Sequence, residues 1–230
     1  DGRLAELLAD QHPAQALARN LYRLDRLVRQ TAESQAIRTE VDMATQWWGS
    51  ADGRRDDDHR TRARLLRVLA ERALAAPSPW DVSGEPVQAI DQLRVSGTLR
   101  EFGHDRVAFK HDVLRDWAVA NFLHEDSTQI SKLPLSGPAP VGLHRSLELA
   151  ARMAIERASD DGRWAQLLDL VSAPDVHGSW RRAVLLALVR SEAGPRLLAL
   201  AGPRLLADRA RLLGELIRTA LAADGPPGIY

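Results

Sequence analysis

Side chains that could do chemistry are few in this sequence and stand apart from one another. The 230 residues include no cysteine, and the seven histidines occur singly, without partners at the spacing of metal ligands. The acidic run Asp56, Asp57 and Asp58 lacks the glycine-turn spacing of a calcium loop, so we interpret residues 49–60 as a solvated loop. The motifs of phosphate-binding loops, serine hydrolases and zinc proteases are missing. We therefore expect no catalytic residue, no metal site and no cofactor in this chain.

The most specific string covers residues 107–123 and reads Val-Ala-Phe-Lys-His-Asp-Val-Leu-Arg-Asp-Trp-Ala-Val-Ala-Asn-Phe-Leu. Its first residues predict a strand, and the residues after Asp112 have the apolar spacing of a helix. An aspartate at a helix start can accept backbone N–H groups and is favoured by the helix dipole, so we predict Asp112 as the helix cap. His111 then stands at the joint between strand and helix, where the residues alone favour local packing or capping.

The elements before and around this string predict a small domain over residues 36–125. Thr39 is placed to cap a first helix, and a second helix follows the loop. A third begins at Pro86 and should turn three apolar residues inward, Val87, Ile90 and Leu93. Residues 98–110 then predict a β-hairpin with a Gly-His-Asp turn, before the helix at 112–124. Three helices followed by a hairpin is the order of a winged helix.

The rest of the chain is predicted to be helical. Prolines and glycines crowd residues 126–142, which we interpret as a linker, and a helical-repeat-like domain follows over 143–223, with a tail at 224–230. Breaks in this domain include Gly202-Pro203, and Trp180 should pack between helices although Arg181 and Arg182 follow it. The predicted fold class is mainly α, with a winged-helix module bearing one small β-hairpin and then an α-helical array. This array is either HEAT/armadillo-like or an ordinary bundle.

Charge excludes a globally basic nucleic-acid binder, because 31 basic side chains are balanced by 31 acidic ones. The segment that would read DNA, residues 85–106, has three arginines against four acidic residues, which argues against DNA as a partner. There is no apolar run long enough to span a membrane and no signal peptide, so we expect no membrane contact and a cytoplasmic location. The chain lacks an initiator Met, so we expect it to be a piece of a longer protein.

The string around His111 resembles the end of the winged-helix domain of STAND NTPases, the signalling ATPases that include NACHT and NB-ARC proteins. In that family a Met-His-Asp triplet follows the last strand and opens a helix; here His111 and Asp112 match, and Lys110 stands in the Met position. Upstream, the string Arg-Asn-Leu-Tyr-Arg-Leu at residues 19–24 resembles the lid helix of the family, although the proline frequent there is absent. Residues 1–35 are accordingly predicted as lid-type helices.

The resemblance implies that this is the non-catalytic C-terminal part of such an ATPase, without the P-loop core. It would couple nucleotide state to a helical sensor or partner-binding surface, in signalling, transcriptional regulation or defence. His111 would reach the β-phosphate of ADP held by a nucleotide-binding domain that is missing from this chain, so ATP or ADP would belong to the parent protein. The sequence identifies no protein partner. Two alternatives stay open: a winged-helix DNA-binding regulator with a helical dimerisation or ligand domain, and a helical-repeat interaction scaffold.

Overall fold

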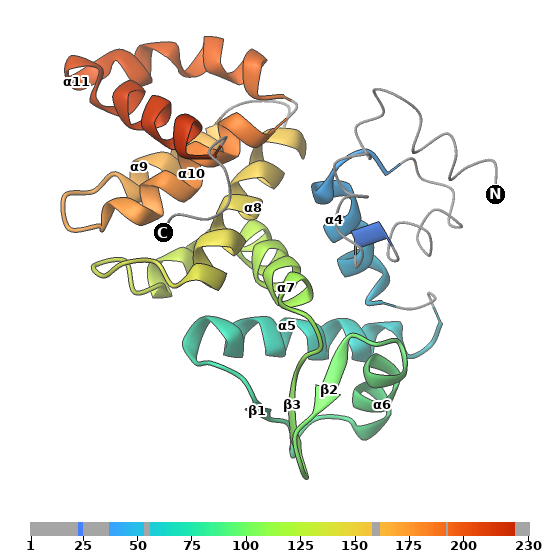
Figure 1. The fold of residues 1–230 in the computed structure, drawn as a ribbon. Coiled ribbons are helices and arrows are strands. Elements are labelled where there is room, and N and C mark those ends of the chain that lie inside the picture. The colour runs from blue at the N-terminus through green and yellow to red at the C-terminus, as the bar shows by residue number, and fades with distance from the viewer. Residues whose placement is uncertain (1–22, 25–36, 53–55, 158–161, 192, 224–230) are drawn as a thin grey trace. The chain divides into compact units, whose positions relative to one another are not determined.

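The computed structural model describes residues 23–24, 37–52, 56–157, 162–191 and 193–223. Within these ranges the fold is mainly helical, with one small three-stranded sheet (Figure 1). The chain divides into two compact units. The first unit runs up to Val68 and resumes over Asp81–Lys110, whereas the second holds Leu69–Trp80 and the residues from His111 onward. The predicted lid-type helices of residues 1–35, except residues 23 and 24, and the predicted tail at 224–230 lie outside the described residues.

The first unit opens with helix α4 (Glu40–Ser50), which begins where the sequence predicts. The Thr39 hydroxyl accepts the backbone N–H of Asp42, and the Asp42 carboxylate accepts the backbone N–H of Thr39, so a complete capping box starts the helix. Met43 and Trp47 then point into the core and are almost fully buried. This local start signal explains why the boundary could be predicted from sequence.

Helix α6 (Val87–Val95) follows helix α5 (His59–Ala75) and turns a different face inward from the one predicted. Ala89 and Leu93 are buried, while the Val87 side chain is 72% exposed. Residues four apart share one face of a helix, and a position two residues away is rotated by about 200°. Once Ala89 and Leu93 face the core, Val87 has to face solvent, so its predicted inward orientation is wrong.

The acidic run between α4 and α5 is tied to α6 (Val87–Val95) rather than simply solvated. The buried Arg62 guanidinium donates to the Asp56 carboxylate at 2.9 Å and to the Gln92 side-chain oxygen at 3.0 Å. The Asp58 carboxylate in turn accepts the side-chain amides of Gln88 and Gln92, each at 2.7 Å. Asp56 and Asp58 therefore have a structural role within the first unit, while Asp56 and Asp57 are also exposed, as the interpretation of a solvated loop expects.

The hairpin is confirmed. Strands β2 (Leu99–Glu101) and β3 (Arg106–Phe109) pair antiparallel, with Leu99 opposite Phe109, and the turn between them has positive φ at Gly103 and Asp105. A third strand, β1 (Trp80–Asp81), extends the sheet in the order β1-β3-β2. Strand β1 was not predicted from the sequence, because two residues are too few to show the alternation of apolar and polar side chains that marks a strand.

The second unit consists of helices that pack in succession. These are α7 (Asp112–Glu125), the 3-10 helix η1 (Ser127–Lys132), α8 (Val141–Arg157), α9 (Gly162–Val171), α10 (Gly178–Arg190) and α11 (Gly194–Ala223). Helix α7 packs on α8, α8 on α10, and α10 on both α9 and α11. Trp117, Trp164 and Trp180 are fully buried, so the predicted packing role of Trp180 is confirmed. The unit includes α7, whereas the sequence analysis grouped that helix with the winged-helix domain at 36–125.

The segment predicted as a linker, residues 126–142, is an ordered connection in the structure. Ile130 and Leu133 are buried. The Trp180 indole N–H donates to the carbonyl oxygen of Gly137 at 3.0 Å, and the Ala139 N–H donates to Ser179 at 2.8 Å. Residues 133–140, which hold most of these prolines and glycines, form no helix, whereas Ser127–Lys132 forms η1 and α8 begins at Val141. Tertiary contacts with α10 hold the connection in place.

The last predicted break, Gly202-Pro203, is also corrected. Helix α11 continues through Pro203 and instead changes direction over residues 207–210, where Asp208, Arg209 and Ala210 have positive φ. Pro203 is exposed, so water can take over the carbonyl that loses its N–H partner to the proline ring. Of the helices in the described ranges, none combines the length and apolar character needed to cross a bilayer.

Candidate functional site

His111 lies where the chain leaves the first compact unit and enters the second. Just before it, the Lys110 N–H donates to the carbonyl oxygen of Thr98 at 2.8 Å, which closes the hairpin. His111 itself has extended backbone angles, φ −133° and ψ 143°, and its carbonyl accepts the N–H of Leu114 at 3.0 Å. It is therefore the N-cap residue of α7, and its side chain is exposed. We call Lys110, His111 and Asp112 the hairpin–helix joint.

Asp112 is the first residue of α7, one position later than predicted. The N-cap geometry belongs to His111, whose side chain does not cap the backbone N–H groups of the helix. The Asp112 carboxylate is 88% exposed and pairs with Arg115 at 3.3 Å. It still favours the helix, because a negative charge in the first turn interacts well with the helix dipole. The prediction of Asp112 as the cap is therefore corrected, although its position in the first turn is favourable.

A second carboxylate lies one turn further along α7. Asp116 accepts hydrogen bonds from Nε and Nη2 of Arg115, at 3.2 and 2.9 Å. Burial nevertheless raises the pKa of Asp116 to about 6, against the opposing effect of the Arg115 hydrogen bond and charge. A Cβ atom at Gly142 would overlap the Arg115 guanidinium, so the glycine leaves room for this arginine between α7 and α8.

The opposite end of α7 also contains a perturbed group. The Arg163 guanidinium donates to the backbone carbonyl of His124, while the buried Nδ1 of that histidine has no hydrogen-bond partner in the described part of the chain. Burial, together with the positive charges of Arg163 and Arg157, lowers the pKa of His124 to about 4. This histidine is therefore neutral at pH 7 and acts there as a packing residue.

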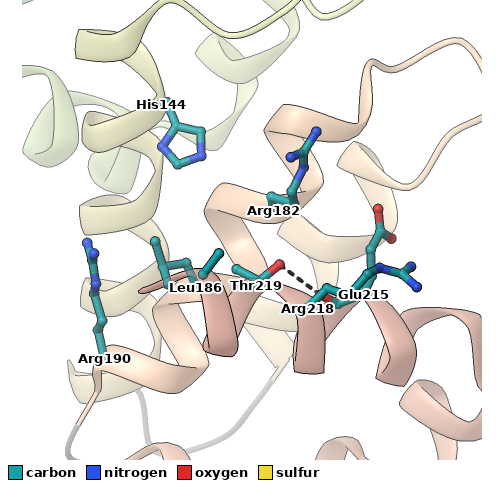
Figure 2. A pocket seen from close by; sticks show the side chains of 8 residues that line it. His144, Arg182, Leu186, Arg190, Glu215, Arg218 and Thr219 are labelled. Carbon is teal, nitrogen blue, oxygen red and sulfur yellow. Dashed lines mark hydrogen bonds between the residues drawn. The ribbon is translucent and has the colours of Figure 1, made fainter. Parts of the chain in front are cut away.

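A cleft of about 530 Å³ lies between three helices of the second unit (Figure 2). We call it the basic cleft. Its walls come from α8, α10 and α11, and its lining residues are His144, Arg182, Leu186, Arg190, Glu215, Arg218, Thr219 and Ala222. Figure 2 shows the arginine side chains distributed around the cleft, with Leu186 and Thr219 between them.

Two glutamates near the basic cleft are each neutralised by arginine. Glu215 accepts two hydrogen bonds from Arg181, at 2.6 and 2.9 Å, and this bidentate pair joins α10 to α11. Glu148, on α8, is almost fully buried and accepts hydrogen bonds from Arg145 at 2.8 Å and Arg190 at 2.9 Å. Burial opposes the charge of Glu215, but the Arg181 hydrogen bond and charge hold its pKa below the ordinary value.

Two arginines of the basic cleft have no such partner. Arg182 and Arg218 are exposed and form no ion pair within the described ranges. His144 is partly buried, and burial lowers its pKa. The negative charge of Glu148 raises this pKa, whereas the positive charge of Arg182 lowers it further. The imidazole is therefore neutral at pH 7, and the excess charge of the cleft comes from the arginines.

The basic cleft could not be predicted from the sequence, because its lining residues come from three helices and span residues 144–222. The one local signal is the pair Arg181-Arg182, which the sequence analysis connected with packing around Trp180. Helix geometry separates the two arginines: Arg181 bonds Glu215 across helices, whereas Arg182 faces the cleft. The acidic and histidine side chains of the described residues form no group that could hold a metal ion.

No family model matches the chain, and a search of curated proteins finds no significant match.

Proposed function

We propose that this chain is the non-catalytic regulatory region of a STAND-type ATPase. In this proposal residues 38–110 form a winged-helix module, and the hairpin–helix joint faces a nucleotide-binding domain of the parent protein. Helices α8 to α11 then form a sensor or partner-binding array of HEAT-like pairs. The protein would act in the cytoplasm, which agrees with the absence of cysteine.

The observation that supports the proposal most strongly is the position of His111. Its side chain is exposed at the N-cap of α7, at the last of the three points where the chain passes between the two compact units. An exposed imidazole N–H can donate to a phosphate oxygen, and the N-terminus of a helix favours a nearby anion. A contact between His111 and a phosphate would act at a point where the two units are joined by the backbone. A rigid-body switch needs a contact at such a point.

The three helices and the small sheet of residues 38–110 support the winged-helix part of the proposal, but they do not favour DNA as its partner. Helix α6 has one basic residue, Arg94. Its guanidinium is bonded to Glu101 at 2.7 Å and paired with Asp91 at 3.0 Å. An arginine held by two carboxylates is poorly suited to contact phosphates. The charge distribution therefore favours a protein surface over DNA.

The coding sequence upstream of Asp1 tests this proposal first. We expect it to encode a Walker A motif within a nucleotide-binding domain, and the protein expressed with that domain should purify with ADP bound. An upstream region without this motif, or an extended protein that binds no nucleotide in a calorimetric titration with ADP, would contradict the proposal and favour a helical-repeat scaffold.

A further inference from the structure

We infer that the basic cleft binds a small organic anion, through a phosphate or carboxylate group held between Arg182 and Arg218. This inference concerns the cleft within the second unit and does not depend on the proposed STAND-type function.

The first argument is charge. Five arginines lie in or beside the basic cleft, Arg145, Arg181, Arg182, Arg190 and Arg218, whereas two glutamates balance them. Both glutamates accept hydrogen bonds from other arginines, Arg181 in one case and Arg145 and Arg190 in the other. The charge of Arg182 also acts on Glu215, but the arginines outnumber the carboxylates, and such an excess creates a positive potential that attracts an anion from solution. The guanidinium group also matches phosphate and carboxylate oxygens in a bidentate geometry.

The second argument is shape and lining. The volume of about 530 Å³ lies within the range of small-molecule sites, which is roughly 300–1,000 Å³. Leu186 supplies a mostly buried apolar wall, and the Thr219 hydroxyl is turned to the backbone carbonyl of Glu215 at 2.8 Å. The lining therefore suits a ligand that combines an oxyanion with a compact apolar body.

The third argument is preorganisation. The bidentate Arg181–Glu215 pair fixes the last part of α11 on α10, and the Arg190–Glu148 pair fixes α10 on α8. A ligand would therefore meet walls that are already in position, which lowers the entropic cost of binding. Arg182 and Arg218 line one cleft between helices and not an open face, which favours a small molecule over an acidic protein segment.

Calorimetric titration of the chain tests this inference with defined probes. The probes are inorganic pyrophosphate, phenyl phosphate, phthalate and a glutamate-rich decapeptide. We expect saturable binding of phenyl phosphate or phthalate, and these two arms distinguish a phosphate from a carboxylate preference. Arg182→Gln and Arg218→Gln should each weaken binding about tenfold or more, because each removes a charge-assisted hydrogen bond.

Arg196→Gln is the matched control, because Arg196 is an exposed arginine of α11 that does not line the cleft. It should leave binding unchanged, and circular dichroism should show that all three variants fold. Equal binding by Arg182→Gln, Arg218→Gln and the native chain would overturn the inference. The same conclusion would follow if the decapeptide alone bound, or if none of the probes showed saturable binding at millimolar concentration.

Discussion

The hairpin–helix joint and the basic cleft both present side chains that can donate hydrogen bonds to an anion, but they differ in what surrounds them. At the joint, His111 and Lys110 are followed by Asp112 and then Asp116, so acidic groups stand close along the same helix. In the basic cleft, arginines outnumber carboxylates, and the carboxylates are already bonded. The cleft can therefore attract an anion unaided, whereas the joint needs a partner that positions the anion for it.

The largest expected effect is on the affinity of the basic cleft for a small anion, and it distinguishes the cleft from the hairpin–helix joint. The double variant Arg182→Gln/Arg218→Gln should lower the affinity for the small anion by about a hundredfold, because two charge-assisted hydrogen bonds are lost. His111→Ala should leave this affinity unchanged, since His111 does not line the cleft. Titration calorimetry on the three proteins measures both effects. A similar loss in His111→Ala would break the distinction between joint and cleft.

A second prediction concerns Asp116, which lies next to the joint. Its pKa is raised to about 6 from 3.8, so the folded state binds more protons than the unfolded state between these values. This contribution to stability is therefore lost as the pH rises through 6. Relative to the native chain, Asp116→Asn should be more stable at pH 7 than at pH 4, by about 2 kcal/mol.

Urea unfolding at both pH values measures the free energy of unfolding for this comparison. Asp126→Asn is a control on a half-buried carboxylate whose pKa is lowered instead by hydrogen bonds from Gln129 and Thr128. It should change stability in the opposite sense with pH. A pH-independent difference between Asp116→Asn and the native chain would show that Asp116 ionises normally.

An effect with the same sign as that of Asp126 is expected at the far end of α7. The pKa of His124 is lowered to about 4 from 6.5, so the unfolded state binds more protons between these values. The stability of the native chain should therefore gain from His124 as the pH rises from 4 to 6.5. His124→Gln should reduce this gain, whereas His104→Gln, in the exposed hairpin turn, should not. Thermal unfolding over this pH range gives the comparison.

The joint and the cleft also differ in how much of each could be predicted from the sequence. The hairpin and the start of α4 are specified by neighbours in the chain, Gly103 and Asp105 in one case and Thr39 with Asp42 in the other. The hairpin–helix joint is also specified by neighbouring residues. The sequence predicted its N-cap one residue too late, at Asp112 instead of His111. Local hydrogen bonds and turn conformations act over a few residues, so the residues that determine them are adjacent in the sequence.

The features that were missed depend on tertiary packing. The face of α6 that is buried is the one that carries Leu93. Residues 126–142 are held in an ordered conformation by contacts with α10. The basic cleft is an extreme case, because Arg182 and Arg218 come together through the packing of α10 and α11. Neither arginine has a sequence neighbour that marks it as part of a site.

The dissociation rate of ADP from the intact parent protein tests the central claim most directly. His111→Ala should release ADP at least about tenfold faster than the native protein, because one hydrogen bond to an anionic oxygen is lost. His104→Ala, which changes an exposed histidine in the turn of the hairpin, should release ADP at the native rate. Equal rates for His111→Ala and the native protein would contradict the account.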